Sequence, residues 1–193
     1  LTSNQNMPRR KGALAFLALI SAFPPLSTVL YLPALPQMVE ALDTTQTRVN
    51  MTLSMFFLFF SVGLLFWGPL SEKFGRKPIL LSGLTIYVFA SVACAFSQNV
   101  EQLIAFRIVQ ALGGSAGTVV ATAIVKDLYS GREREKVMAT IMSMVIIAPM
   151  VAPVLGALLL KYTSWRTIFL MLAAIGATAL LRGFFFQETL FRS

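Results

Sequence analysis

The sequence predicts an all-α, polytopic membrane protein with six transmembrane helices, and three observations support this prediction. Of the 193 residues, 56% are hydrophobic and only 12% are charged, whereas an ordinary soluble domain carries roughly 25% charged residues. The mean hydropathy is high, at +0.75. The charges lie in short clusters between long apolar stretches. This composition excludes a disordered chain, a coiled coil and most soluble enzymes.

A bilayer has a hydrocarbon core of ~30 Å, which needs about 20 apolar residues in a helix. Five uncharged stretches meet this length directly, and a sixth meets it if Arg182 snorkels to the interface. Because lipid offers no partners to backbone groups, each span must be a helix or a barrel strand. Runs such as 55–65 lack the alternation of a barrel strand. We therefore predict a helical bundle over 12–187. Its helices lie at approximately 12–38, 49–71, 78–98, 102–125, 137–160 and 166–187.

The basic residues indicate how these helices are oriented. Eleven Lys and Arg residues precede the first span, follow the second, fourth or sixth, and only three lie in the other loops. By the positive-inside rule, both ends of the chain are then cytoplasmic. Residues 1–11 form a cytoplasmic N-terminal segment, and 188–193 begin a cytoplasmic linker. The net charge of +8 is a topology signal on this interpretation, and we expect no nucleic-acid partner.

A secretory signal peptide is the other interpretation of the N-terminus. A signal peptide has an apolar region of roughly 7–15 residues followed by a small-residue cleavage site. The apolar segment here is longer and contains four prolines between residues 24 and 36. The sequence favours a first transmembrane helix.

The side-chain inventory argues against an enzyme. The chain has no histidine, and its eight acidic residues all fall at span ends or in loops. Metal–histidine sites, Ser-His triads and paired catalytic carboxylates are therefore not predicted, and no cofactor or metal is implied. The single cysteine, Cys94, excludes a disulfide framework within the chain and is interpreted as a packing residue.

The loop after the second predicted helix is closely patterned. Gly68 allows the end of that helix to approach a neighbour, and Gly75 permits the positive φ of a tight turn. A simple positive-inside anchor is the alternative interpretation, since any basic loop provides one. The residues that define the pattern are Gly68, Glu72, Lys73, Gly75, Arg76 and Lys77.

The fourth predicted helix contains Arg107, the one charge that we expect to stay inside a span, since Arg182 in the sixth span can snorkel to the interface. Charges within a membrane usually face a cavity or a partner. Gln110 follows three residues later, on the same helix face, which favours a polar strip. The alternative is that Arg107 lies near the outer end of the helix and snorkels to the interface.

The fifth predicted helix combines small residues with prolines. Ala148, Ala152 and Gly156 are four residues apart and form a face on which another backbone can pack closely. Pro149 and Pro153 remove two backbone donors and bend or loosen the helix. Ordinary helix packing explains the small residues equally well.

These segments resemble a known family. The loop resembles the signature Gly-x-Leu-x-Asp-Arg-x-Gly-Arg-Arg/Lys of the major facilitator superfamily. Residues 107–114 resemble its Arg-x-x-Gln-Gly motif, with Ala111 replacing the first glycine, and 148–157 resemble the antiporter motif Gly-x-x-x-Gly-Pro-x-x-Gly-Gly. Three segments are similar to the narrower bicyclomycin/chloramphenicol-resistance (Bcr/CflA-type) group of drug:proton antiporters: Tyr31-Leu32-Pro33-Ala34-Leu35-Pro36, Trp165-Arg166-x-Ile168-Phe169 and Glu188-Thr189-Leu190.

The resemblance implies the N-terminal six-helix half of such a transporter, built as a 3+3 inverted repeat, with substrate bound between two halves near the midplane. It implies multidrug efflux by proton antiport in the bacterial cytoplasmic (inner) membrane. The implied partners are a drug-like or metabolite substrate, protons, lipid, and a C-terminal half or a second copy. The implied substrate-cavity and coupling residues are Thr28, Tyr31, Arg107 and Gln110.

The same resemblance implies that the remaining two motifs take part in the conformational change of transport. The loop between the second and third helices is the gating element. The fifth helix is a moving seam, with Ala148, Ala152, Pro153 and Gly156 as its key residues.

Two positions depart from the family pattern. Val29 stands where an acid is expected, two residues before Tyr31, and valine cannot carry a proton as a buried acid would. Glu72 stands where the loop motif has Asp, and its extra methylene changes its reach. We expect the chain to be a fragment of a longer gene rather than a truncated remnant or a dimerising half. An uncoupled metabolite facilitator and a non-transporting remnant that only associates with other membrane proteins are the alternative functions.

Overall fold

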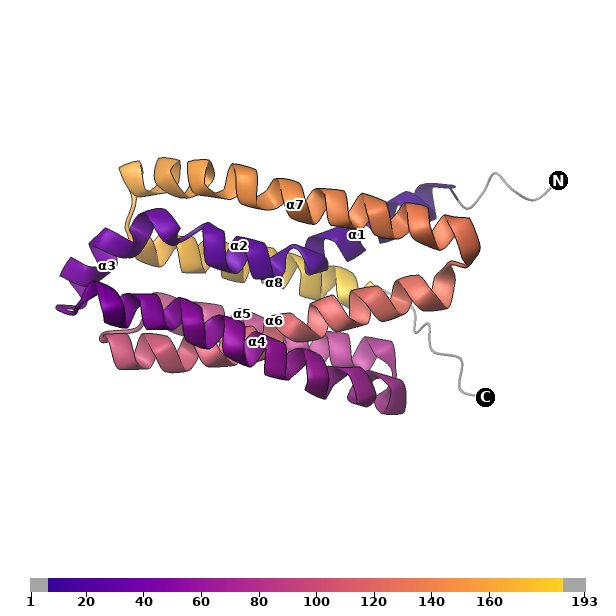
Figure 1. Ribbon diagram of the computed structural model, residues 1–193, viewed down its shortest axis with the longest axis horizontal. Coiled ribbons are helices and arrows are strands. Elements are labelled where there is room, and N and C mark those ends of the chain that lie inside the picture. Colours follow the sequence, from indigo (N-terminus) through magenta and orange to yellow (C-terminus); the bar gives the residue numbers. More distant parts are fainter. Residues whose placement is uncertain (1–6, 186–193) are drawn as a thin grey trace.

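A computed structural model describes residues 7–185, and their side chains from Leu14 onward, and every regular element in it is helical. The helices run side by side along the long axis of the molecule (Figure 1). The predicted linker at 188–193 and the last two residues of the sixth predicted span lie outside the described residues, as do 1–6. The elements are α1 (Met7–Ser21), α2 (Phe23–Val29), the 3-10 turn η1 (Leu32–Ala34), α3 (Leu35–Ala41), α4 (Gln46–Phe74), α5 (Arg76–Ala95), α6 (Val100–Leu128), α7 (Gly131–Tyr162) and α8 (Trp165–Phe185).

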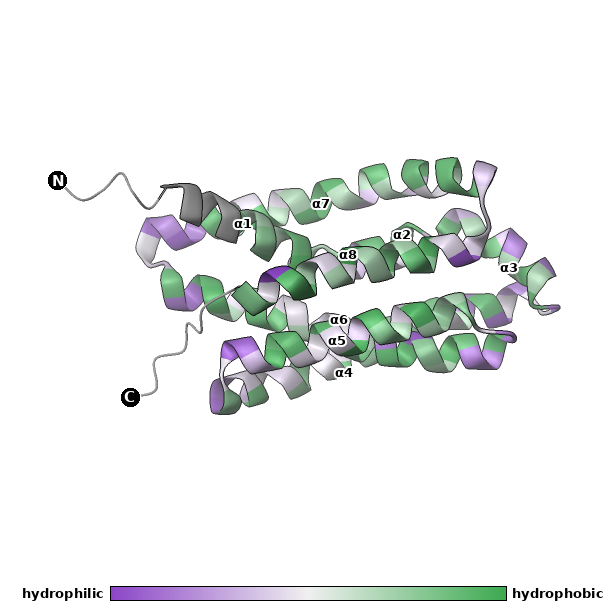
Figure 2. Ribbon diagram, turned by 180° about the vertical axis from the view of Figure 1, so that it is seen from behind, coloured by the Kyte–Doolittle hydropathy of each residue, from purple (hydrophilic) through white to green (hydrophobic). Residues whose placement is uncertain are grey.

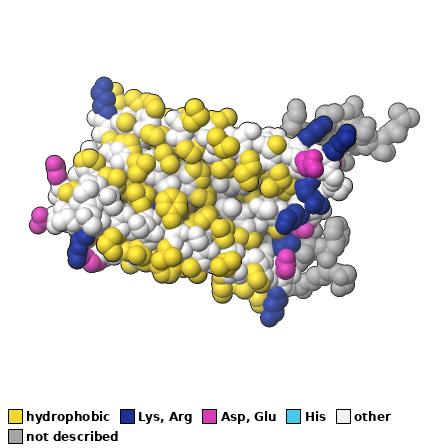
Figure 3. Space-filling model, in the orientation of Figure 1, with side chains coloured by type: hydrophobic (Ala, Val, Ile, Leu, Met, Phe, Trp, Pro, Cys, Tyr) yellow, Lys and Arg dark blue, Asp and Glu magenta, His cyan; other side chains and the backbone are white. Residues whose placement is uncertain are grey.

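Five of these helices, α4 to α8, are long and apolar enough to cross a membrane, and a bent helix pair provides a sixth span. Hydrophobic residues dominate the middle of the bundle, and hydrophilic residues lie toward its ends (Figure 2). The space-filling view shows the same division, with Lys, Arg, Asp and Glu at the two ends (Figure 3). The predicted all-α membrane bundle is confirmed.

The single continuous helix predicted over 12–38 is wrong. The chain instead bends by 41° between Leu14–Ser21 and Phe23–Ala41, and 3-10 turn η1 interrupts the second part. Proline lacks the backbone N–H and clashes with the carbonyl four residues earlier. Pro24 and Pro33 therefore occupy the first turns of new helical segments. The backbone ladder of α2 ends with the bond from Leu30 N–H to Leu26 O, which leaves the following carbonyl available to a side-chain donor.

Helix α6 is the centre of the bundle. It packs extensively on α4 and α5, and α8 covers the other side of α5. The α5–α6 crossing is close because Gly113 faces Gly83: a Cβ on Gly113 would lie 2.7 Å from Gly83 O. Within the most apolar 18-residue window of each helix, 61% of the α6 residues are buried but only 11% of the α7 residues. Helix α7 therefore borders the bundle and contacts mainly the first span.

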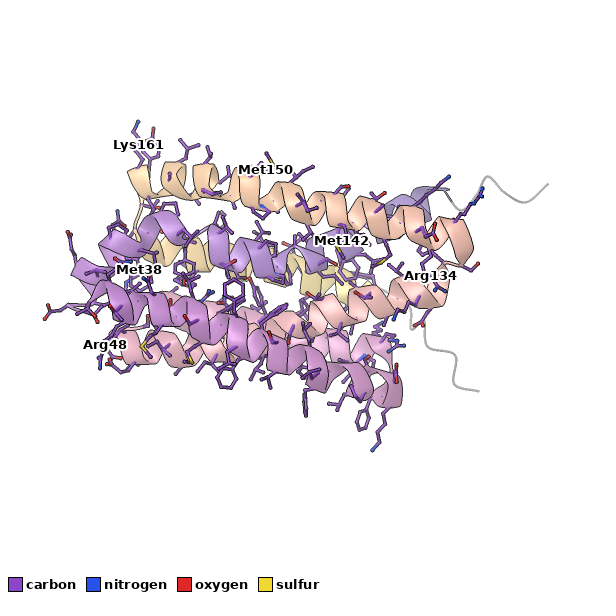
Figure 4. All side chains as sticks on the ribbon, viewed as in Figure 1. Met38, Arg48, Arg134, Met142, Met150 and Lys161 are labelled. Carbon is purple, nitrogen blue, oxygen red and sulfur yellow. The ribbon has the colours of Figure 1, made fainter. Side chains whose placement is uncertain are left out.

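Basic residues lie at both ends of the bundle. Arg134 lies at the end that carries the α4–α5 and α6–α7 connections, and Arg48 and Lys161 lie at the opposite end (Figure 4). We call the first of these the basic end. Helices α6 and α7 extend beyond the predicted spans 102–125 and 137–160, because their charged last and first turns stay helical outside the apolar region.

Candidate transport site

Arg107 lies about 10 Å along α6 from its first residue, given a rise of 1.5 Å per residue, and is fully buried. Its side chain is therefore enclosed by the bundle. Its Nη1 donates to the backbone oxygen of Ser27 at 2.9 Å and to Oε1 of Gln110 at 2.6 Å. The break in the first span leaves the backbone carbonyl of Ser27 available to accept this hydrogen bond. A cation at the C-terminal end of a helix is also favoured by the helix dipole. Arg107 thus ties α6 to the end of α2.

Aromatic rings surround the rest of this guanidinium. The Arg107 Cζ atom lies 4.2 Å from the ring centroid of Phe56, 4.7 Å from that of Tyr31 and 5.9 Å from that of Phe169. Among the described residues, Nε and Nη2 have no hydrogen-bond partner, and no carboxylate pairs with Arg107. The positive charge is stabilised by ring faces and neutral oxygens rather than by a counter-ion.

A chain of hydrogen bonds continues from Gln110 into α5. Gln110 Nε2 donates to Ser91 Oγ at 2.7 Å, and Ser91 Oγ donates to the Tyr87 backbone oxygen at 2.7 Å. The Tyr87 hydroxyl lies 2.6 Å from Ser27 Oγ, which returns the chain to α2. These side chains are all buried. The network therefore joins the first span, α5 and α6 through buried, hydrogen-bonded side chains in the membrane-spanning part of the bundle.

The other two predicted cavity residues differ from each other. The Tyr31 hydroxyl bonds Thr52 Oγ1 of α4 at 2.8 Å, and Thr52 in turn donates to a backbone oxygen of its own helix. Tyr31 thus links the Arg107 cluster to α4. Thr28 is buried but donates to the Pro24 backbone oxygen at 2.8 Å, so the structure does not bring it into the network. Val29 is partly buried and packs against the apolar core.

The loop pattern at the basic end forms one compact ion-pair site. Gly75 has φ 106° and separates α4 from α5, which confirms the expected positive φ. Arg76 is buried and donates from Nε to Asp127 Oδ2 at 3.1 Å and from Nη1 to Ser71 Oγ at 2.7 Å. Lys77 Nζ donates to the Phe184 backbone oxygen at 2.7 Å. The loop therefore joins the basic ends of α4, α5, α6 and α8.

Three residues of the loop pattern lie apart from this site. Glu72 and Lys73 are exposed, and Glu72 makes no ion pair among the described residues. Lys73 lies over the ring of Phe74, 5.3 Å from its centroid. The close approach expected at Gly68 is wrong within the described bundle, because a Cβ there would have no atom within 4 Å.

The small residues of α7 face the break in the first span. Ala152 and Gly156 are buried, and a Cβ on Gly156 would overlap the backbone oxygen of Leu30 and lie 3.5 Å from Pro33 Cγ. Ala148 and Pro153 are partly buried. Helix α7 runs from Gly131 to Tyr162 without interruption across both prolines. The α7 backbone therefore touches the first span at the point where its α-helix is interrupted.

Several members of the site were not singled out from the sequence. Ser27, Ser91, Tyr87 and Thr52 carry the hydrogen-bond network, and Phe56 lies over Arg107. Ser27 precedes Tyr31 by four residues, which was a usable signal. The others come from α4 and α5, and nothing in their local sequence separates them from neighbouring polar or aromatic residues.

Removing the partner of Arg76 is expected to destabilise the basic end. In Asp127→Asn the buried guanidinium keeps its bond to Ser71 but no longer faces a negative charge at position 127, and the loss of this charge-assisted hydrogen bond costs about 1–3 kcal/mol. The apparent melting temperature in detergent, measured by size-exclusion chromatography after heating, should fall. Glu72→Gln should leave it unchanged, because Glu72 is exposed and forms no ion pair in the described structure. Equal shifts in the two variants would contradict this assignment.

The fold and this site together define a multi-span α-helical membrane protein with a buried cationic network. The chain belongs to the major facilitator superfamily, because the model of that family matches residues 15–190. It is 40% identical over 183 residues to a "Chloramphenicol resistance protein" of Pseudomonas aeruginosa, covering 92% of this chain and 44% of that protein.

Two further relatives give a similar picture. A "Bicyclomycin resistance protein homolog" of Haemophilus influenzae is 34% identical over 182 residues, covering 93% of this chain and 46% of that protein. A "Multidrug resistance protein" of Escherichia coli is 31% identical over 161 residues, with 83% and 41% covered. The predicted similarity to the bicyclomycin/chloramphenicol-resistance group is confirmed. The chain spans less than half the length of these relatives.

Proposed function

We propose that this chain is the N-terminal six-helix half of a drug exporter that works by proton antiport when a second six-helix half completes it. The observation that carries the proposal is the buried Arg107 network. A charged side chain inside a membrane protein is costly and marks a substrate or ion pathway by default. The names of three relatives, which refer to resistance against chloramphenicol, bicyclomycin and multiple drugs, support drug-like molecules as the substrate class.

The packing of the first span supports a transport cycle. Arg107 on α6 holds the end of α2, and Gly156 on α7 touches the following turn. Movement of either helix is therefore transmitted to the segment at 30–34, where the α-helix of the first span is interrupted. Alternating access in this fold is a rocking of helix bundles around a fixed site. In our proposal the Arg76–Asp127 site holds one of the two states at the basic end, which faces the cytoplasm together with both ends of the chain.

In our proposal proton coupling uses a buried carboxylate, and the described part of the chain holds none in the middle of a span. Within residues 7–185, the acidic residues lie in the loops or near the helix ends, and Val29 occupies the expected acid position. In our proposal the proton-carrying carboxylate therefore comes from outside the described residues, where it also balances the charge of Arg107.

Drug susceptibility in an efflux-deficient bacterial host tests the exporter proposal. The 193-residue chain is compared with the same chain extended by any coding sequence that follows it in the gene. If only the longer product confers resistance to chloramphenicol or bicyclomycin, this result supports the proposal that the 193-residue chain is one half of an exporter and needs a second half. Resistance from the shorter chain points to a functional dimer instead. If both products reach the membrane and neither confers resistance, drug export is wrong and the facilitator or remnant function takes its place.

Introducing an acid at Val29 is expected to make efflux more dependent on pH. In Val29→Asp a partly buried carboxylate that can bind and release a proton stands on the first span, close in sequence to Ser27 and Tyr31. Efflux of a fluorescent drug from loaded cells is measured at external pH 6 and 8, with Val29→Asn as the uncharged control. Identical pH profiles of the two variants would show that this position has no part in coupling.

A further inference from the structure

A cavity of about 170 Å³ lies between the first span, α6 and α7, apart from the Arg107 network. Thr118, one of its lining residues, follows Arg107 by eleven positions, which is about 16 Å along α6 toward the basic end. The cavity exists because the first span bends at Ala22 and because small side chains of α6 face the bend. A cavity of roughly 150 Å³ holds a benzene ring, so its size suits one ring or a short alkyl group.

The cavity wall is mostly apolar but carries three hydroxyl groups. These belong to Ser21, Thr118 and Thr122. Thr118 Oγ1 is buried and has no hydrogen-bond partner among the described residues. Thr122 Oγ1 donates to the Thr118 backbone oxygen at 3.0 Å, so its lone pairs remain available as acceptors. A buried hydroxyl without a partner is costly, and a ligand atom that bonds Thr118 removes this cost.

Among the side chains that the structure describes, no Lys, Arg, Asp or Glu lines this cavity. An ion placed here would lose its hydration without gaining a counter-charge, which is strongly unfavourable. The wall on the α7 side includes Met138 and Met142, whose unbranched side chains adapt to ligands of different shape. Figure 4 labels Met142 near the side of α7 that faces the rest of the bundle. A wall of this composition therefore favours a ligand group that is uncharged and carries one hydrogen-bonding atom.

We propose that this cavity is a second substrate subsite, which takes an uncharged aromatic or alkyl group carrying one hydrogen-bonding atom that bonds Thr118. The proposal rests on the exporter function, since it assigns this subsite to the same substrate. Its position toward the basic end places it on the side from which an exporter loads its substrate. Ala121, which is almost fully buried in the wall, sets the depth of the subsite.

Methyl NMR tests the subsite without requiring transport. The sample is the gene product that contains this chain, at its natural length and in detergent micelles. Methionines are labelled with ¹³C at the methyl group, and Met138 and Met142 are assigned by their Leu variants. Benzyl alcohol is the probe, and benzyltrimethylammonium is its charged counterpart. We expect saturable shifts of the Met138 and Met142 signals with benzyl alcohol alone. Met150 is 73% exposed and does not line the cavity, so its signal should not follow the same curve.

Two variants make this binding experiment specific. Ala121→Leu should abolish the saturable shifts by filling the cavity, and Thr118→Val should weaken binding about fivefold by removing one hydrogen bond. Ala174→Leu makes the same change on the exposed face of α8 and should bind like the parent. Equal binding by the parent and Ala121→Leu, or equal shifts from the charged probe, would overturn the subsite.

A resistance assay separates this proposal from the exporter function. If the parent confers chloramphenicol resistance, Ala121→Leu should lower the inhibitory concentration of chloramphenicol at least fourfold when the parent and the variant reach the same level in the membrane. Ala174→Leu should not lower it. Resistance by the parent without saturable methionine shifts would overturn the subsite and leave the exporter standing. Saturable shifts in a parent that confers no resistance would support a ligand site and overturn the exporter.

Discussion

Replacing Arg107 by lysine is expected to destabilise the bundle about as much as replacing it by methionine, although lysine keeps the positive charge. The planar guanidinium bonds Ser27 and Gln110 through one nitrogen while its faces lie against Tyr31 and Phe56. The lysine ammonium is compact and strongly hydrated and cannot reproduce this arrangement. Two acceptors then lose their donor, at about 1–3 kcal/mol each. We expect a loss of about 3 kcal/mol in both variants.

The apparent melting temperature in detergent, measured by size-exclusion chromatography after heating, checks this prediction. Arg182→Lys is the matched control, because Arg182 is exposed in the last turn of α8 and the same substitution there should have no effect. A lysine variant at 107 that melts with the parent would mean that the charge alone, rather than the planar geometry, holds α6 to the first span.

Adding one methyl group at Gly156 is expected to cost stability, even though alanine favours a helix by about 1 kcal/mol over glycine. The new Cβ would overlap the Leu30 backbone oxygen. A backbone carbonyl cannot swing aside as a flexible side chain can, so α7 must move away from the first span. Overpacking of this kind typically costs about 1–3 kcal/mol. We expect Gly156→Ala to lose about 2 kcal/mol and to reduce efflux in the exporter assay.

Gly68→Ala provides the control for helix propensity. The same substitution within α4 meets no atom within 4 Å, so only the gain in propensity remains, and the melting temperature should stay level or rise. If both alanine variants shift the melting temperature equally, the contact between α7 and Leu30 does not limit stability.

Hydropathy predicts the number of spans well and the course of a span poorly. The bilayer requires a minimum length of apolar helix, and charge-free stretches reveal this length directly. The same criterion takes no account of backbone direction, so the first span was predicted as one helix despite Pro24 and Pro33. It also marks where the apolar region ends rather than where the helix ends. Helix α7 therefore begins at Gly131, six residues before the predicted 137.

The candidate site could be predicted only where its members share a helix. Arg107 and Gln110 are three residues apart, and the spacing alone places them together. Ser91 and Phe56 join them through the packing of α5 and α4 on α6, which depends on side chains distributed over the whole bundle. The sequence contains a cluster of four phenylalanines at 56–60, and nothing local distinguishes Phe56, which is fully buried, from Phe57, which is 53% exposed.

The hydrogen bond from Arg107 to the first span also has a consequence for how the protein is made. Translation proceeds from the N-terminus, so Ser27, Tyr31 and Phe56 are synthesised before Arg107. The carbonyl of Ser27 and the two nearest ring faces, those of Tyr31 and Phe56, are then already inside the bilayer when α6 leaves the insertion machinery, and only Phe169 follows later. An arginine facing bare hydrocarbon would be expelled toward the interface. The order of segments along the chain thus allows a charged helix to enter the membrane with its partners in place.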